Sequence, residues 1–108
     1  MTTHPAIVSI RRVLALASIP AADPGRIGAE PGVSVRASDG VLELASLAVE
    51  DGPTLRELEA AFGPSRELPP VWGAAYSVVT FDRRGPLGLF AHIDDAIGVA
   101  IELIVRRY

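Results

Sequence analysis

The sequence predicts a single α+β domain in which a mainly antiparallel sheet carries helices packed on one face. Three observations predict this class. The chain has 108 residues, the size of one ordinary domain. Helical spacing of apolar residues occurs in two separate segments, and the segments with strand patterns follow one another in runs. The expected order is α-β-β-α-β-β-β, within one domain that spans residues 1–108.

Residues 5–18 are predicted to form the first helix. Pro5 suits a first turn, where its missing N–H costs nothing, and Pro20 and Pro24 are expected to end the helix. The segment 19–32, IPAADPGRIGAEPG, has no periodicity and is expected to be a connector ordered around Ile27. The apolar residues of the helix recur at helical spacing: Ile7, Ile10, Val13, Leu14 and Ala17.

Residues 33–49 are predicted to form a β-hairpin whose turn is Asp39-Gly40, a pair suited to positive φ. Leu42 and Leu44 share one face of the second strand, whereas Leu47 and Val49 fall on the other. This change of phase predicts either a β-bulge or a strand that is covered on both sides.

Residues 54–63 carry the clearest local signal, a short helix of about nine residues that begins with a capping box. Thr54 caps the N–H of Glu57, and Glu57 reaches back to Thr54. Leu55, Leu58 and Phe62 form the stripe expected to be buried, and Gly63-Pro64 ends the helix.

The segment 65–74, SRELPPVWGA, is expected to be a loop, followed by strands over residues 75–82, 87–93 and 98–106. The last of these also fits a helix beginning at Asp95, with Ile97, Ile101, Ile104 and Tyr108 on one side. Strand is favoured because IGVAIELIV is rich in β-branched residues and contains an internal glycine.

Composition excludes several chemistries. The chain has no cysteine, so it forms no disulfide and offers no thiol nucleophile or thiolate ligand. All ten basic residues are arginine, and the lack of lysine excludes a Walker-type phosphate loop and Schiff-base chemistry. No cofactor is expected. Arginine without lysine or asparagine, together with abundant alanine, glycine and proline, indicates a GC-rich, bacterial genome.

The charge and the apolar content indicate what kind of partner to expect. A net charge of −3 argues against nucleic acid and against an anionic membrane surface. Apolar residues make up 49% of the chain, more than the interior of so small a domain is expected to bury. Part of that surface is therefore expected to face a pocket or a protein partner, with a homodimer as the simplest arrangement. The oligomeric state itself stays open.

The N-terminal segment raises the question of export. Arg11 and Arg12 precede a short apolar run over residues 13–19, which resembles a secretory leader. The run is at the short limit for such a leader, and no run approaches the length that spans a membrane. A cytoplasmic location is therefore expected.

His92, Asp94 and Asp95 form the densest cluster of titratable side chains. In a strand His92 and Asp94 project to the same face, which makes them candidates for the first two ligands of a metal, or for an acid–base pair. The preferred interpretation is structural: the two aspartates fill a turn and bond to its backbone.

Arginines and the only tryptophan supply the candidate binding residues. Arg83 and Arg84, beside aromatic strand residues, are typical of an RNA-binding sheet, but the central strand positions carry Val and Leu, so a solvated turn is preferred. Arg66, Pro70 and Trp72 suggest a docking segment or an aromatic anchor for a partner. The alternative, preferred for Trp72, is that its ring covers one end of the core.

Three functions remain compatible with the sequence. The preferred one is a non-catalytic protein-interaction module of the adaptor, immunity or chaperone-like kind. The second is a domain that binds a small molecule or acyl chain in an apolar pocket between sheet and helix, lined by residues such as Phe81, Leu89 and Phe90. The third, less favoured, is an enzyme that uses His92 with a nearby aspartate.

Overall fold

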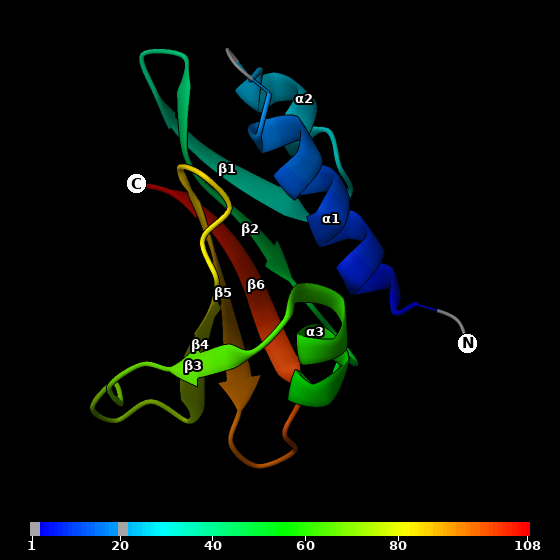
Figure 1. The fold of residues 1–108 in the computed structure, drawn as a ribbon, viewed down its shortest axis with the longest axis vertical. Helices are drawn as coiled ribbons and strands as arrows, with labels where there is room; N and C mark the ends of the chain where they lie inside the picture. Colours follow the sequence, from blue (N-terminus) through cyan, green and yellow to red (C-terminus); the bar gives the residue numbers. More distant parts are fainter. Residues whose placement is uncertain (1–2, 20–21) are drawn as a thin grey trace.

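The computed structural model describes residues 3–19 and 22–108, which form an open antiparallel sheet with helices on one face (Figure 1). The strands lie in the order β1-β2-β6-β5-β4-β3, so the hairpin β1-β2 joins the C-terminal strand in the middle of the sheet. The predicted α+β class is confirmed. The helices are α1 (Pro5–Ala17), α2 (Pro24–Gly28) and α3 (Leu55–Phe62); the strands are β1 (Val33–Ser38), β2 (Val41–Ala48), β3 (Ser65–Glu67), β4 (Tyr76–Phe81), β5 (Leu87–Asp94) and β6 (Ala100–Arg107).

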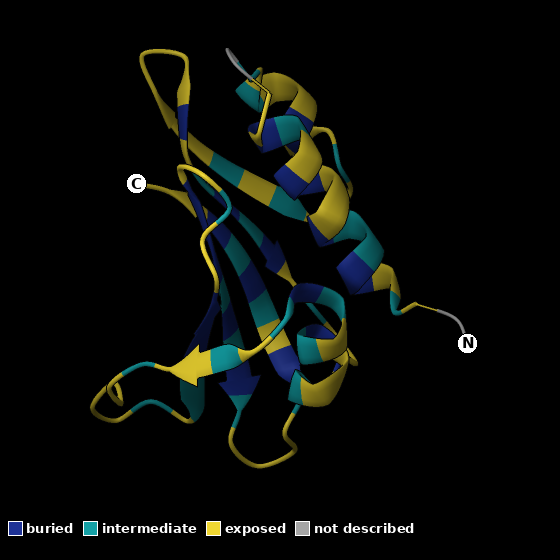
Figure 2. Ribbon diagram, in the orientation of Figure 1, coloured by how far each residue is buried: buried dark blue, intermediate teal, exposed yellow. Residues whose placement is uncertain are grey.

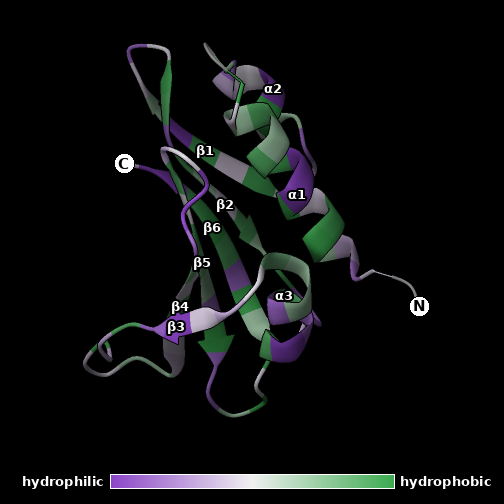
Figure 3. Ribbon diagram, in the orientation of Figure 1, coloured by the Kyte–Doolittle hydropathy of each residue, from purple (hydrophilic) through white to green (hydrophobic). Residues whose placement is uncertain are grey.

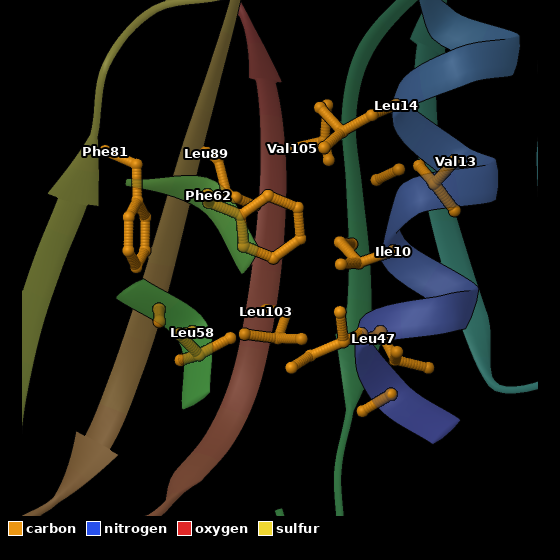
Figure 4. Close-up of a cluster of buried hydrophobic side chains, with 14 of the residues drawn as sticks. Ile10, Val13, Leu14, Leu47, Leu58, Phe62, Phe81, Leu89, Leu103 and Val105 are labelled. Atoms are coloured by element: carbon orange, nitrogen blue, oxygen red, sulfur yellow. The ribbon is translucent and has the colours of Figure 1, made fainter. Parts of the chain in front are cut away.

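The core lies between the sheet and the helices, as the alternation of buried and exposed positions shows (Figure 2). Helix α1 presents its predicted stripe to the sheet, and α3 adds Leu58 and Phe62. On the sheet side, alternate strand residues such as Leu89, Leu103 and Val105 complete the cluster (Figure 4). Figure 3 shows that the central strands are mainly hydrophobic, whereas the edge strand β3 is hydrophilic.

The segment after α1 contains a helix that the sequence did not predict. Helix α1 ends at Ala17, with Ser18 as its C-cap, one residue before the predicted end. Pro24 does not terminate α1. It opens α2, whose N-cap Asp23 accepts a hydrogen bond from Gly25 N–H at 2.8 Å. The other expected terminator, Pro20, lies outside the described residues. The five-residue helix was missed because so short a turn has no periodicity, but the expectation that the segment is ordered around Ile27 is confirmed, since Ile27 is fully buried.

The phase change in the first hairpin results from a β-bulge. The register shifts so that Arg36 pairs with Leu44 and Ala37 with Leu42, which leaves Glu43 as the extra residue. Leu42 therefore faces the core, whereas Leu44 lies on the opposite face, half-buried. The prediction that these two leucines share a face is wrong, because the bulge lies between them. The bulge, one of the two predicted alternatives, returns Ala45 to the core side.

Helix α3 begins and ends as predicted. The Thr54 hydroxyl accepts from Glu57 N–H at 3.2 Å, and Glu57 Oε1 accepts from Thr54 N–H at 3.1 Å, which completes the capping box. Gly63 follows with φ of 91°, a conformation that favours glycine. Phe62 packs edge-on against Phe81 at 6.0 Å between ring centroids, which fixes the helix to the sheet.

The chain passes from β2 to α3 through a tight crossing against β6. Val49 N–H donates to Ile101 O at 3.0 Å, and Ala100 N–H donates to Pro53 O at 2.8 Å. Gly52 lies between these hydrogen bonds. A Cβ at Gly52 would overlap the carbonyl oxygen of Ala100 and would lie 2.9 Å from its carbonyl carbon.

The C-terminal half contains one more strand than predicted. Part of the expected loop 65–74 forms β3, in which Ser65 pairs with Phe81 and Glu67 with Val79. A three-residue strand gives too short an alternation to recognise in the sequence. Residues 100–107 form a strand, so the alternative helix from Asp95 is wrong. Of the helices described, none is long and apolar enough to cross a membrane.

Candidate binding surface on the uncovered face of the sheet

One face of the sheet carries no described helix, and we call it the open face. Strand alternation assigns its side chains, because the residues between the buried positions project away from the helices. The direct cross-strand pairs join Leu44 to Arg106, Phe90 to Ile104 and Val78 to His92. Over the six strands the open face presents Ser34, Arg36, Ser38, Val41, Leu44, Ser46, Ala48, Arg66, Tyr76, Val78, Thr80, Gly88, Phe90, His92, Asp94, Glu102, Ile104 and Arg106.

A shallow apolar hollow of about 240 Å³ lies at the centre of the open face. Its side chains come from the consecutive strands β2, β6, β5 and β4 and from Leu68, which follows β3. All the apolar members are half-buried, so each leaves part of its surface to solvent. The members of this apolar hollow are Leu44, Leu68, Val78, Phe90 and Ile104, with His92 and Arg106 at its rim.

His92 sits at the rim in a defined orientation. Its ring stacks on Tyr76, with the centroids 4.5 Å apart and the planes 12° from parallel. Its Nδ1 atom lies 3.9 Å from Glu102 Oε1. Both neighbours come from adjacent strands, so the sheet itself fixes the imidazole between them.

Tyr108 follows β6 and folds back over β5. Its ring covers Gly88, where an added Cβ would lie 2.5 Å from Tyr108 Cε2 and 3.0 Å from Phe90 Cε2. Tyr108 and Phe90 are neighbours, with 6.4 Å between their centroids. The Arg83 guanidinium lies 3.9 Å from the centroid of the Tyr108 ring, close enough for a cation–π interaction. Glycine at position 88 therefore makes room for the tyrosine on the open face.

A second hollow, of about 220 Å³, lies next to Tyr108, and we call it the cationic pocket. Arg66 enters it from β3 and Arg83 from the β4–β5 turn. Thr80 contributes a hydroxyl that already donates to Leu89 O at 3.0 Å. The residues that line the cationic pocket are Pro64, Arg66, Thr80, Phe81, Asp82, Arg83 and Tyr108.

The two adjacent arginines of the β4–β5 turn have different roles. Arg83 faces Tyr108, whereas Arg84 donates to Phe62 O at 3.5 Å and lies 5.4 Å from the Phe62 ring centroid. Arg84 thus binds the C-terminal end of α3, where a cation opposes the partial negative charge of the helix. Of the predicted pair, Arg83 belongs to the cationic pocket and Arg84 holds a helix in place.

Trp72 does not cover an end of the core. Its side chain is 100% exposed, and Val71 beside it is half exposed. Pro70 is also exposed, and the β3–β4 loop that carries these residues projects away from the sheet (Figure 1). The packing alternative that the sequence favoured for Trp72 is therefore wrong. The predicted residues Arg66 and Trp72 do not share a surface hollow, since Trp72 lines neither the apolar hollow nor the cationic pocket.

Asp94 has the backbone role expected of it. Its Oδ1 atom accepts from Ala96 N–H at 2.8 Å and from Ile97 N–H at 3.3 Å, while Asp95 accepts from the Ser77 hydroxyl at 2.6 Å. Within residues 3–19 and 22–108, no three His, Asp or Glu side chains gather as metal ligands would. His92 and Asp94 lie on the same face of β5, and the carboxylate within 4 Å of the His92 ring is that of Glu102.

His4 is engaged at both ring nitrogens. Nδ1 accepts from Ala6 N–H at 3.0 Å and so caps α1, and Nε2 lies 2.7 Å from Asp51 O. A hollow of about 400 Å³ opens beside it, lined by the first turn of α1 and the residues after β2. The imidazole ties these two segments together and has no nitrogen left to act as a base.

The predicted apolar residues Phe81, Leu89 and Phe90 do not line one cavity. Phe81 and Leu89 belong to the core under the helices, and Phe90 projects to the open face. The sequence did not single out Leu44, Ile104, Arg106 or Tyr108 as surface residues. The change of phase at Leu44 was the available signal, but only the strand order reveals that β6 lies between β2 and β5.

Comparison of the chain with family models, with curated proteins and with solved structures gives no match. Its function must therefore be inferred from its own residues.

Proposed function

We propose that this protein is a non-catalytic interaction module of the bacterial cytoplasm that binds an acidic segment of a partner protein on its open face. The observation that supports this is the combination of the central apolar hollow, which Arg106 borders, with the neighbouring cationic pocket, which contains Arg66 and Arg83. Half-buried apolar side chains supply contact area, and the arginines supply orientation and charge. An adaptor, an immunity protein or a chaperone requires no more than this.

The charge of the open face favours an acidic partner over a second copy of the chain. The whole protein carries −3, yet four of its ten arginines, Arg36, Arg66, Arg83 and Arg106, lie on or beside the open face, against the three carboxylates of Asp82, Asp94 and Glu102. The excess of positive charge lies at the cationic pocket, so two copies that brought these pockets together would oppose like charges, which costs affinity. A homodimer remains the alternative occupant, and the experiment below separates the two.

The aromatic side chains favour a protein partner over nucleic acid. Single-stranded nucleic acid is bound by stacking bases on free aromatic faces. Here Tyr76 already stacks on His92, and the Tyr108 ring is already faced by Arg83. A protein segment needs only apolar contact and hydrogen bonds, which these fixed rings still provide.

The second candidate function is the binding of a small apolar ligand. The apolar hollow supports it by its composition, because five of its seven lining residues are apolar. Its volume of about 240 Å³ is below the roughly 300–1,000 Å³ of usual ligand pockets. A single side chain of a partner fits such a volume better than an acyl chain.

A random peptide library displayed on phage tests the proposal directly. Peptides selected on the wild-type protein are expected to combine acidic and apolar residues. Their binding is expected to be lost in Ile104→Glu, which places a carboxylate in the apolar hollow, and to persist in Ile97→Glu, a matched change at an exposed position between β5 and β6. If Ile104→Glu does not fold by circular dichroism, Leu68→Glu probes the same hollow from the loop.

Three results would overturn the proposal. One is a selection without a common acidic motif; another is binding that survives both hollow variants. The third is native mass spectrometry of the wild type showing a dimer that Ile104→Glu converts to monomer, which would assign the open face to self-association.

A further inference from the structure

The cationic pocket contains two guanidinium groups that no carboxylate neutralises within the described chain. Within residues 3–19 and 22–108, the arginine that forms an ion pair with a carboxylate is Arg12, with Glu30. Arg66 and Arg83 form no such pair within these residues. Asp82 lines the same hollow but lies outside ion-pair range of both, so the pocket keeps a net positive charge.

The groups of the pocket converge although they come from distant parts of the chain. Arg66 is on β3, Arg83 follows β4 and Tyr108 follows β6. The Tyr108 ring holds the guanidinium of Arg83 at 3.9 Å, which lowers the entropy that this arginine would lose on binding. Arg66 is fixed at its backbone by pairing with Thr80.

These donors suit an oxyanion. A guanidinium presents parallel N–H groups that match the oxygens of a carboxylate or phosphate in a bidentate manner. Tyr108 contributes its ring to the wall of the pocket, where it faces Arg83, whereas the Thr80 hydroxyl is already committed to Leu89 O. A neutral ligand would leave the two charges unused.

We infer that the cationic pocket binds the oxyanion group of a partner side chain, namely the carboxylate of Asp or Glu or the phosphate of a phosphorylated residue. This inference rests on the proposed function and deepens it, because it assigns the acidic part of the ligand to one place. Phe90 joins the two hollows: it lines the apolar hollow and its ring lies 6.4 Å from that of Tyr108. The partner segment therefore carries an anionic side chain close to an apolar one.

Nuclear magnetic resonance titration with simple anions tests the pocket without a partner. Sodium acetate and inorganic phosphate are added separately at constant ionic strength, with chloride as the reference, while the arginine Nε–Hε signals are followed. The signals of Arg66 and Arg83 are expected to shift saturably. Arg66→Gln and Arg83→Gln are each expected to weaken the binding at least tenfold, whereas Arg56→Gln, at an exposed position on α3, leaves it unchanged.

The anion that binds more tightly identifies the ligand. Preference for acetate points to Asp or Glu, and preference for phosphate points to a phosphorylated side chain. Small, linear shifts at all arginines, or saturable shifts that survive both pocket variants, would overturn the inference. If anions bind saturably but no peptides are selected, the anion pocket is supported and the proposed function is refuted. If peptides are selected but their affinity is unchanged in Arg66→Gln and Arg83→Gln, the proposed function is supported and the inference about the pocket is refuted.

Discussion

Replacement of Gly52 by alanine tests whether the crossing between β2 and α3 is as tight as the structure places it. A Cβ at this position would overlap the Ala100 carbonyl oxygen and lie 3.2 Å from Val49 Cγ1. The Ala100 carbonyl is part of the main chain of β6, a central strand of the sheet. Rotation of a side chain therefore cannot relieve the overlap. The two segments must separate by more than about 1 Å to restore an ordinary contact.

The free-energy cost follows from what that separation breaks. The flanking hydrogen bonds from Val49 to Ile101 and from Ala100 to Pro53, at 3.0 and 2.8 Å, would be stretched or lost, at about 0.5–1.5 kcal/mol each. Overpacking strain adds roughly 1–3 kcal/mol, and the lower entropy of the unfolded alanine chain returns about 0.4–1 kcal/mol. Gly52→Ala is therefore expected to destabilise the fold by about 3 kcal/mol, which lowers Tm by roughly 12 °C in a domain of this size.

Urea unfolding followed by far-ultraviolet circular dichroism measures this change. Gly28→Ala is the matched control, because its Cβ would lie an ordinary 3.5 Å from Val35 Cγ2. That variant is expected to stay within about 1 kcal/mol of the wild type. If Gly52→Ala is as stable as Gly28→Ala, the close approach of the two backbones is refuted.

Three further predictions concern single side chains. Gly88→Ala should leave stability within about 1 kcal/mol, because only the rings of Tyr108 and Phe90 must move and no backbone is displaced. It should nevertheless weaken saturable anion binding, because it displaces the Tyr108 ring that holds Arg83; unchanged binding would contradict the position of Tyr108 over β5. Trp72 fluorescence should already resemble that of tryptophan in water and should keep its emission wavelength on unfolding; a shift of the emission to the red would show that the ring is buried. Thr54→Ala should cost about 1 kcal/mol in urea unfolding through loss of the N-cap, whereas Thr3→Ala, at an exposed position before α1, should cost nothing measurable; equal effects would refute the capping role.

Local rules of the sequence predicted those parts of the fold that local contacts determine. The capping box of Thr54 and Glu57 specifies the start of α3, since both of its hydrogen bonds lie within four residues. The bulge in the first hairpin was detectable from the change of phase between Leu42 and Leu47, but its position at Glu43, between Leu42 and Leu44, was not. Helix α2 and strand β3 are too short to show a periodic pattern in the sequence. Helix α2 is stabilised by the burial of Ile27.

The binding surface was only partly predictable, because it depends on the order of the strands. Arg66 was recognised as a candidate by its place in a loop with Pro70 and Trp72, and Arg83 by its place in a turn beside aromatic strand residues. Their convergence with Tyr108 requires β5 to lie between β4 and β6, which hydrophobic alternation alone does not encode. Trp72 was expected to pack because tryptophan usually does; the turn at Trp72-Gly73, with Gly73 at φ of 78°, directs it away instead.

The two edges of the sheet differ in a way that limits how copies of the chain could associate. Strand β1 pairs only with β2 and leaves one side of its six-residue backbone without a strand partner. The opposite edge, β3, has three residues and runs into Pro69 and Pro70, which lack the N–H that a further strand would require. Two copies that meet through β1 would use up the longer edge of the described sheet in each copy and leave only the short, proline-bounded β3 edges outside, so growth would stop at a closed pair and no fibre would form.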